Sequence, residues 1–268
     1  MMNGLIYTLL CPTLCWLLSV DSMRIRRDAR HLTMMDDSVD DMYHGCNYKK
    51  MKELDSLYPE ELKKGLFAEA WKNAETCATE NFKKWSKENK DLTKDHMQAI
   101  CVYTENKNKV YPAFNKAVRE QGKEYGTKEF QFHILHFLLT SAIQILNPSN
   151  VCYITYRRTD GEYSGKVNEE IRFGMFASSS FRNDQFSYGT KTCFKIKTCL
   201  GASLKKYSVH EEEEEVLIPP YEKFTIEKVV KNPHDIEELK DCKLVYVLKG
   251  AGHKSTYNCN QFLDKAKL

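Results

Sequence analysis

The sequence has no large excess of charge, no second long apolar stretch and no Cys-x-x-Cys pair. Its 268 residues carry 40 basic and 37 acidic side chains, and the lysines are scattered along the chain. This balance argues against a nucleic-acid-binding protein, which would gather its positive charge on one face. No cysteine lies near a histidine at zinc-finger spacing, so we expect no metal site. Apart from one run of glutamates, no repeat or low-complexity segment is evident.

The longest apolar stretch lies near the start of the chain. Residues Gly4–Val20 read GLIYTLLCPTLCWLLSV. The stretch is short for a membrane-spanning helix, which needs about 20 apolar residues, and it contains Pro12. It fits a cleaved secretory signal better, and we assign residues 1–22 to it. The final residues, 261–268, lack the apolar tail of a lipid-anchor signal, so we expect a secreted, extracellular protein without a membrane anchor.

The cysteine count agrees with export. Two of the ten cysteines, Cys11 and Cys15, fall inside the predicted signal. The other eight lie at positions 46, 77, 101, 152, 193, 199, 242 and 259. An even number in an exported chain is typical of disulfides, although spacing alone does not give their pairing.

The first half of the chain has the periodicity of helices. Apolar residues recur every three to four positions, which predicts helices over 59–85, from Thr93 onward, over about 113–121 and over 129–146. Pro59 suits a first helical position and Thr93 suits an N-cap. The last of these helices is apolar almost all round and is expected to be buried. We expect His133 and His136 on it to be core or edge histidines rather than ligands.

The second half has the pattern of strands. Short β-branched or aromatic runs occur at Val151–Arg158, Ile171–Ser178, Thr192–Thr198, Val216–Ile218, Phe224–Lys231 and Lys243–Leu248. Helices first and strands afterwards predict an α+β protein, with a helical N-terminal part packed on a mostly antiparallel sheet or sandwich. We divide the chain into an irregular leader (23–50), a helical region (51–150) and a β-rich catalytic region (151–268).

The glutamate run, Glu211–Glu215, continues directly into Val-Leu-Ile and two prolines. An acidic run taken alone is most often a solvated face. Here the three branched residues favour a strand, and the last glutamates are expected to begin it. Alternation would then place Glu213 and Glu215 on one side, roughly 7 Å apart, with Glu214 pointing away. Two carboxylates held in this way make a reasonable acid/base pair.

Three pieces of the β-rich region can be read together: Tyr156-Arg157, then Phe176-Ala177-Ser178-Ser179-Ser180, then Glu-x-Glu before Val-Leu-Ile-Pro-Pro. In this order the chain resembles the vertebrate arginine-specific mono-ADP-ribosyltransferase family, with its R-S-E-x-E signature, over nearly everything after the signal. The resemblance implies the ADP-ribosyltransferase fold. It also implies transfer of ADP-ribose from NAD, as co-substrate, to arginine side chains of extracellular target proteins, with release of nicotinamide and without a metal.

The resemblance gives the two glutamates separate roles. Cleavage of the nicotinamide–ribose bond passes through an oxocarbenium-like state, which Glu215 would stabilise. A carboxylate placed in this way can contribute roughly 3–4 kcal/mol. The acceptor guanidinium is a poor nucleophile while protonated, and Glu213 would hold it and assist removal of its proton.

The remaining site residues would hold NAD. Arg157 suits a phosphate or ribose clamp, and Ser178 would position Glu215 and the nicotinamide ribose. The loop Phe181–Gly189 is expected to cover the nicotinamide, with Phe186 as a stacking partner. Three alternatives stay open: that Arg157 is a surface cation, that Ser178 only ends a strand, and that Phe186 is ordinary packing. Many relatives have glycine after the first arginine, so Arg158 here raises the question of substrate access and of which arginine is the clamp.

The same resemblance pairs Cys46 with Cys259 and Cys152 with Cys199. For the other four cysteines the pairing stays open. Two neighbouring helices suggest Cys77 with Cys101, which would leave Cys193 with Cys242.

Two further functions stay open beside arginine transfer. Water could replace the guanidinium, which would make the protein an NAD glycohydrolase. The chain could also be an inactive binding scaffold of the same fold, although the intact signature speaks against that. A glycoside hydrolase is disfavoured because it needs carboxyls on opposite sides of a sugar, whereas these two are expected to share a strand face.

Overall fold

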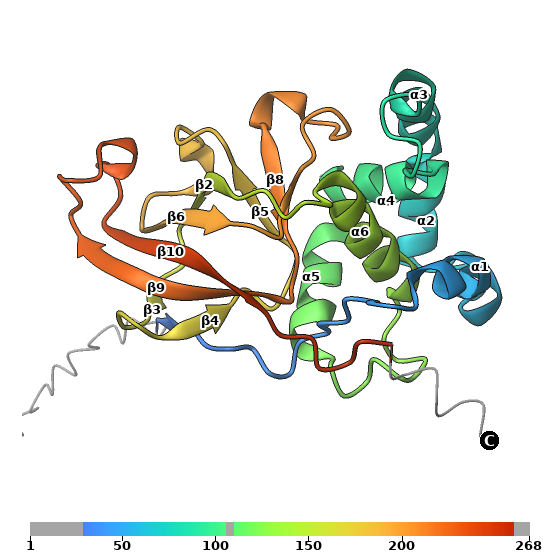
Figure 1. Cartoon of the computed structure of the whole chain (residues 1–268), viewed down its shortest axis with the longest axis horizontal. Helices are drawn as coiled ribbons and strands as arrows, with labels where there is room; N and C mark the ends of the chain where they lie inside the picture. Colours follow the sequence, from blue (N-terminus) through green and yellow to red (C-terminus); the bar gives the residue numbers. More distant parts are fainter. Residues whose placement is uncertain (1–28, 106–109, 260–268) are drawn as a thin grey trace, which may run out of the picture.

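The computed structural model describes residues 29–105 and 110–259, so the predicted signal and the first residues of the leader lie outside it. Six helices gather on one side of the molecule and an eight-stranded sheet on the other (Figure 1). The helices are α1 (Asn47–Leu57), α2 (Leu66–Asn73), α3 (Glu75–Trp85), α4 (Lys94–Thr104), α5 (Val110–Glu120) and α6 (His133–Leu146). Within the described ranges, none of them is long and apolar enough to cross a membrane.

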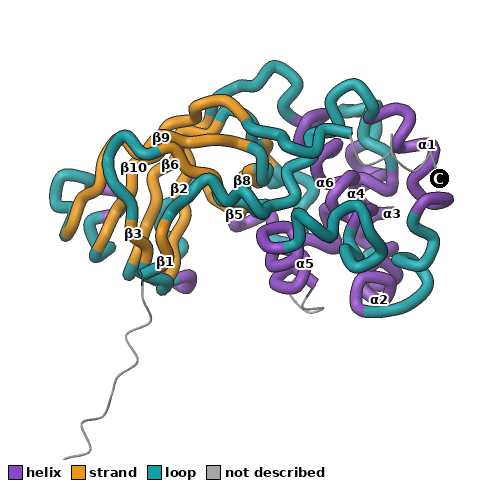
Figure 2. The backbone as a smooth tube through the Cα atoms, turned by 90° about the horizontal axis from the view of Figure 1, so that it is seen from below, coloured by secondary structure: helices purple, strands orange, loops and turns teal. Residues whose placement is uncertain are grey.

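The sheet confirms the predicted α+β class. Its strands are β2 (Tyr153–Thr159), β4 (Glu170–Arg172), β5 (Ala177–Ser180), β6 (Thr192–Thr198), β7 (Ala202–Ser203), β8 (Glu215–Ile218), β9 (Glu222–Lys231) and β10 (Leu244–His253). They lie in the order β4-β9-β10-β6-β2-β5-β8-β7, and every neighbouring pair is antiparallel except β6 with β10. Two short strands, β1 (Arg30–His31) and β3 (Tyr163–Ser164), form a separate parallel pair beside the sheet (Figure 2).

The strand predicted over 171–178 is divided in two. Gly174 has a φ of +64°, and a Cβ there would lie 2.5 Å from the side chain of Met35. The chain therefore turns at this glycine. It leaves β4 at one edge of the sheet and brings β5 between β2 and β8.

Helix boundaries differ from the prediction where distant residues decide them. The N-cap at Thr93 is confirmed, since its hydroxyl accepts from the His96 amide and the His96 ring accepts from the Thr93 amide. The single helix predicted over 59–85 is wrong, because residues 59–64 form turns and the chain breaks at Ala74. Helix α1 was not predicted at all.

Helix α6 begins at His133, four residues later than predicted. The carboxylate of Glu61, from the turn before α2, accepts hydrogen bonds from the amides of His133 and Ile134, both at 3.0 Å. These amides belong to the first turn of the helix, where no intrahelical partner exists. A side chain far away in the sequence thus fixes where α6 starts.

Both histidines of α6 belong to the core, as predicted. His133 lies 2.6 Å from Glu61 through Nδ1, and His136 lies 2.8 Å from the Tyr43 hydroxyl and 3.1 Å from the Val39 carbonyl oxygen. Burial lowers the pKa of His136 to about 3, so its ring is neutral at physiological pH.

The helical core extends onto the inner end of the sheet. Leu217 of β8, Ala202 of β7 and Phe176, just before β5, belong to the same apolar cluster as the helices. The rings of Phe114 on α5 and Phe176 stack with centroids 5.4 Å apart. Tyr207 is buried in this cluster, where its carbonyl oxygen accepts from the Asn81 side chain.

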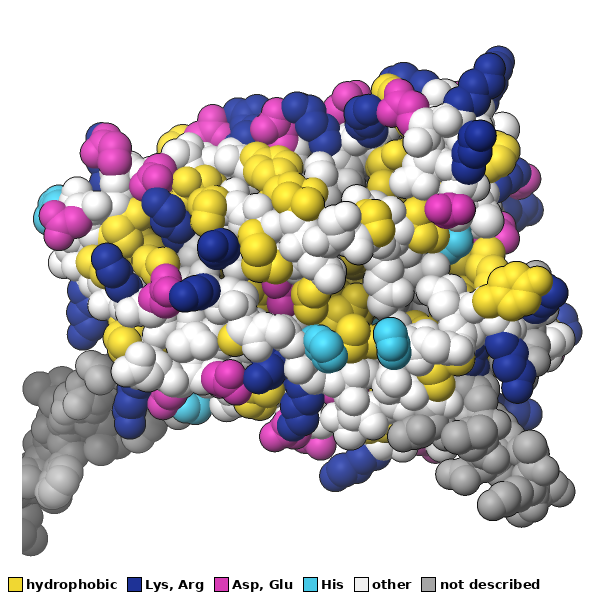
Figure 3. All heavy atoms as spheres, viewed as in Figure 1, with side chains coloured by type: hydrophobic (Ala, Val, Ile, Leu, Met, Phe, Trp, Pro, Cys, Tyr) yellow, Lys and Arg dark blue, Asp and Glu magenta, His cyan; other side chains and the backbone are white. Residues whose placement is uncertain are grey.

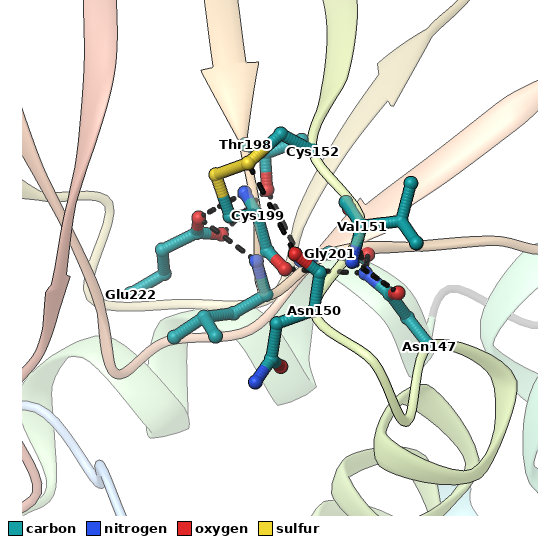
Figure 4. The surroundings of a disulfide bond; sticks show 9 residues. Asn147, Asn150, Val151, Cys152, Thr198, Cys199, Gly201 and Glu222 are labelled. Carbon is teal, nitrogen blue, oxygen red and sulfur yellow. Dashed lines mark hydrogen bonds between the residues drawn. A yellow bond between two sulfur atoms is a disulfide. The ribbon is translucent and has the colours of Figure 1, made fainter.

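Asn147 joins the end of α6 to the sheet (Figure 4). Its side-chain amide donates to the carbonyl oxygens of Val151, Cys199 and Gly201, and its Oδ1 accepts from the Val151 amide. The Cys152–Cys199 disulfide lies beside it. On the other side of Cys199, the buried Glu222 carboxylate accepts from the amides of Cys199 and Leu200.

Four disulfides are formed: Cys46–Cys259, Cys77–Cys101, Cys152–Cys199 and Cys193–Cys242. They include the two pairs that the resemblance implies and the two whose pairing the sequence left open. This content is typical of extracellular proteins. On the face shown in Figure 3, basic and acidic side chains are mixed without a large patch of one sign.

Candidate active site

A cavity of about 250 Å³ opens where the sheet meets the helices. Its walls come from β2, β5, the end of α4, the start of α5, the loop Phe181–Gly189 and the segment before β8. All four residues of the R-S-E-x-E signature line it: Arg157, Ser178, Glu213 and Glu215.

Strand register brings these residues together. Ser180 on β5 pairs with Tyr156 on β2 and with Glu215 on β8, so β5 lies between the strands that carry Arg157 and Glu215. Arg157 Nη1 donates to the carbonyl oxygen of Ser178 at 2.5 Å. The Ser178 side chain is in turn hydrogen-bonded to the Glu215 carboxylate. The first arginine, the serine and the last glutamate thus form one connected chain of contacts.

The backbone that carries Glu213 and Glu215 differs from the predicted strand. The segment Glu211–Glu213 is a 3₁₀ turn, Glu214 has a left-handed conformation with φ of 48°, and β8 begins only at Glu215. The expected strand with Glu213 and Glu215 on one face is therefore wrong, although both line the cavity. The turn still directs Glu214 to an ion pair with Lys205.

Hydrogen bonds from β5 hold this turn in place. The Ser180 hydroxyl donates to the Glu213 carbonyl oxygen at 2.6 Å. The amide of Phe181 donates to the Glu214 carbonyl oxygen at 3.2 Å. Since Ser180 also lines the cavity, the third serine of the run supports the site as well as the first.

Glu215 is poised to change its charge near neutral pH. Only 6% of the Glu215 surface is exposed to solvent. Burial raises the pKa of Glu215 to about 7, and the nearby Glu213 charge adds to the rise, while the Ser178 hydrogen bond and the Arg157 charge oppose it. A carboxylate in such surroundings interacts strongly with any positive charge that forms in the cavity.

Tyr188 contacts the other glutamate. Its hydroxyl donates to Glu213 Oε1 at 2.7 Å. Burial, followed by this hydrogen bond, raises the pKa of Tyr188 above its ordinary value, so the hydroxyl stays protonated and acts as the donor. Tyr188 was not predicted as a site residue, although it lies in the loop expected to cover the nicotinamide.

Two tyrosines from the helical part complete the wall of the cavity, and neither was predicted as a site residue. Tyr103 on α4 donates to the Phe176 carbonyl oxygen at 2.8 Å, and its hydroxyl lies 3.4 Å from Ser178 Oγ. The hydroxyl of Tyr111 on α5 is hydrogen-bonded to Arg157. Nothing in the linear pattern distinguished these residues from ordinary aromatic residues of a helix.

Phe186 and Arg158 lie against each other. Phe186 is 59% exposed and does not line the cavity. Its ring centre lies 4.7 Å from the guanidinium carbon of Arg158. Arg158 is paired with Asp241 through two hydrogen bonds, of 2.6 and 3.0 Å. Because Asp241 engages the guanidinium of Arg158, Arg157 is the better placed of the two arginines to act as a clamp.

No group of three or more His, Cys, Asp or Glu side chains that could hold a metal occurs in the described parts of the chain.

The family model described as NAD:arginine ADP-ribosyltransferase matches residues 32–239, which is most of the chain. The chain belongs to this family.

Curated relatives of this ADP-ribosyltransferase family member match over most of its length. It is 32% identical to the NAD(P)(+)--arginine ADP-ribosyltransferase 2 of Gallus gallus, over 85% of this chain and 72% of that protein. It is also 32% identical to the GPI-linked NAD(P)(+)--arginine ADP-ribosyltransferase 1 of Mus musculus, over 92% and 78%. The Ecto-ADP-ribosyltransferase 5 of Bos taurus is 33% identical, over 76% and 67%.

Solved structures of the eucaryotic mono-ADP-ribosyltransferase ART2.2 have the same fold as this family member. One crystal form matches with a TM-score of 0.67 and 29% identity, over 86% of this chain and 98% of that one. A mutant of the same protein in complex with NAD matches with a TM-score of 0.69 and 28% identity, over the same shares.

Proposed function

We propose that this family member transfers ADP-ribose from NAD to arginine side chains of extracellular proteins and releases nicotinamide. The observation that carries the proposal is that Arg157, Ser178, Glu213 and Glu215 meet in one cavity, in a chain that belongs to the NAD:arginine ADP-ribosyltransferase family. The activity printed in the names of its relatives, and the NAD complex of a solved relative, support the same reading.

In this proposal Glu215 drives bond cleavage. The bond between nicotinamide nitrogen and ribose C1′ breaks, its electron pair leaves with nicotinamide, and positive charge develops on the ribose. The buried Glu215 carboxylate, held by Ser178, stabilises that charge once it is ionised. Because Glu215 is itself buried, this stabilisation is stronger than it would be in solvent.

Glu213 receives the acceptor. A guanidinium nitrogen of the target arginine forms the new bond to C1′, and its proton passes to Glu213. Tyr188 donates to one oxygen of this carboxylate, which leaves the other oxygen for the arginine. The tyrosine also limits the rotation of Glu213, so that the acceptor meets a carboxylate of fixed orientation.

Arg157 and Ser178 would hold the nicotinamide side of NAD. The Tyr111 hydroxyl and the Ser178 carbonyl orient Arg157, whose remaining donors suit phosphate oxygens. Phe186 would take part through the loop that it anchors, because its ring lies outside the cavity lining.

The experiment that tests this function uses the oxidised protein, labelled NAD, and agmatine as a small guanidino acceptor. Nicotinamide release matched by agmatine modification supports the transferase. Nicotinamide release without agmatine modification would make the protein an NAD glycohydrolase. If a protein shown to be folded gives neither product, the proposal fails and an inactive binding scaffold replaces it.

The location of the protein is the remaining part of the proposal. Its four disulfides support extracellular residence, as do relatives named as ecto-enzymes. Other relatives, from Mus musculus and Homo sapiens, are named as GPI-linked, so we propose secretion, rather than anchoring, as a prediction of its own. Expression in animal cells tests it. Activity in the medium supports secretion, whereas activity that stays on the cells until a phospholipase is added contradicts it.

A further inference from the structure

We propose that Arg158 and Asp241 form a clamp that positions the loop Phe181–Gly189 at the mouth of the NAD cavity, so that Arg158 is a positioning residue for the reaction. The inference rests on the proposed function for its kinetic consequence. Its structural part, that the ion pair orders the loop, can be measured without NAD.

Arg158 is one of two neighbouring arginines on β2, and the other is Arg157. Successive strand residues point to opposite faces, and these two side chains follow that rule. Arg157 reaches the carbonyl oxygen of Ser178, inside the site. Arg158 also lines the cavity, but its Nε donates to the backbone of the loop, at the Asn183 carbonyl oxygen, over 2.7 Å.

Asp241 fixes the guanidinium of Arg158 from the other side. The side chain of Arg158 is 2% exposed, and both terminal nitrogens donate to the carboxylate of Asp241. Both hydrogen bonds join a guanidinium to a carboxylate, so they are charge-assisted and stronger than hydrogen bonds between neutral groups. The position of Asp241 is itself fixed, because its neighbour Cys242 is disulfide-bonded to Cys193, which pairs with Arg158 in the strand register.

The loop in turn contacts the catalytic turn. Phe186 lies over the guanidinium of Arg158, and two residues later the hydroxyl of Tyr188 donates to Glu213 Oε1. Gln185 and Tyr188 also line the cavity. The loop is therefore held by Arg158 at its outer side and meets Glu213 at its inner side. Loosening the outer contact would free both the wall beside NAD and the tyrosine that orients Glu213.

A purely structural role explains this arrangement less well. An arginine removed from water is costly unless its donors are satisfied, and here the donors are used to connect the loop to the segment before β10.

The test uses Asp241→Asn, which keeps the shape of a partly exposed side chain, together with Arg158→Met. The matched control is Glu237→Gln, which breaks the exposed Glu237–Lys240 ion pair in the same segment. Three quantities are measured: the melting temperature, hydrogen–deuterium exchange of residues 181–189 without NAD, and kcat and KM for nicotinamide release.

We expect loop exchange in Asp241→Asn to become about tenfold faster, while exchange in the central strands is unchanged. We expect KM for NAD to rise about tenfold, with a smaller change in kcat, because NAD must then order the loosened loop as it binds. Transfer to agmatine should fall relative to NAD hydrolysis, since Tyr188 no longer orients Glu213. Arg158→Met should give the same pattern, and Glu237→Gln should match the wild type.

Unchanged loop exchange in a folded Asp241→Asn variant would overturn the clamp, whatever the activity. Faster exchange with unchanged KM would overturn its role in positioning NAD. An equal effect of Glu237→Gln would show that the whole segment matters rather than the ion pair. An inactive wild type with a loop that still responds to Asp241→Asn would count against the proposed function alone.

Discussion

At the scale of single residues, Glu215 makes the strongest prediction. Glu215→Gln should lower both nicotinamide release and transfer by about 100-fold or more, because the amide cannot balance the positive charge that forms on the ribose. The fold should be kept, since the change removes a buried ionisable group rather than a packed one. Product formation from labelled NAD and the melting temperature measure the two effects.

The neighbouring Glu214→Gln is the control for this prediction. Glu214 belongs to the same acidic run, pairs with Lys205 and does not line the cavity. It should keep nearly full activity, as expected for a partly exposed ion pair. If Glu214→Gln lost as much activity as Glu215→Gln, the general charge of the run would be responsible rather than one placed carboxylate.

Glu213 should separate the two reactions. Glu213→Gln should lose most transfer to agmatine but keep a measurable rate of NAD cleavage, because it removes the proton acceptor and leaves Glu215 in place. The ratio of modified agmatine to released nicotinamide is the quantity to measure. An equal loss of both products would contradict the division of roles between the two glutamates.

The pH dependence should follow the titration of Glu215. Its ionised form is the active one, and its pKa is raised from an ordinary 4.5 to about 7. Activity at saturating NAD should therefore rise as the pH increases through about 7 and reach a plateau above it. A rate that is flat between pH 5.5 and pH 8.5 (roughly one and a half units either side) would show that this titration does not control the reaction.

The same titration has a consequence for stability. The folded state holds the proton of Glu215 more tightly than the unfolded state does. Its contribution to stability is fully present below pH 4.5 and is lost as the pH rises through about 7. The Glu215→Gln variant lacks this loss, so the difference in the free energy of unfolding between variant and wild type should grow with pH across that window.

Which site residues could be predicted from sequence depends on how local their pattern is. Glu213 and Glu215 belong to one short motif, and the resemblance adds Arg157 and Ser178. Tyr103 and Tyr111 line the cavity only because α4 and α5 pack beside β5. A contact between elements so far apart in the sequence cannot be predicted from the order of the residues. The sequence placed Tyr188 in a loop, but it did not indicate that its hydroxyl contacts Glu213.

At the scale of elements, strands were predicted better than helix boundaries. Thr192–Thr198 was predicted with its observed limits, because β-branched and aromatic runs bounded by turn residues are a local signal. The turn at residues 59–64 was predicted as helix, since its sequence has helical periodicity. There, Glu61 is used instead to cap α6, and that tertiary contact outweighs the local preference.

The junction between α6 and the sheet can be tested through Asn147. Its side chain contacts three carbonyl oxygens and one amide, and Asn147→Ala would remove this partner from all four, including the buried Gly201 carbonyl oxygen. We expect a loss of about 3 kcal/mol in the free energy of unfolding, measured with urea. The exposed Ser149→Ala, two residues away, should change it by less than about 0.5 kcal/mol. Equal stabilities of the two variants would mean that water replaces the amide.

At the scale of the whole molecule, the order of helices and strands predicted the two-part α+β architecture. It did not predict which contacts the leader makes with the rest of the fold. Residues 29–46 were expected to be irregular, and they do lack long elements, but Asp40 and Asp41 are fully buried. The partners that make this burial possible come from β4 and from residues near the C-terminal end of the described chain.

The ion pair between Asp40 and Arg172 should therefore control the stability of the whole molecule. Both side chains are completely buried and lie 2.6 Å apart, and Asp40 also accepts from the Thr256 amide. Asp40→Asn would leave a buried guanidinium without its charge partner, which should cost about 3–5 kcal/mol. The exposed Lys223–Glu170 pair provides the control, because Glu170→Gln should cost less than about 1 kcal/mol. Urea unfolding of both variants measures the difference, and a loss below 1 kcal/mol for Asp40→Asn (roughly that of the surface pair) would mean that the leader is not part of the cooperative fold.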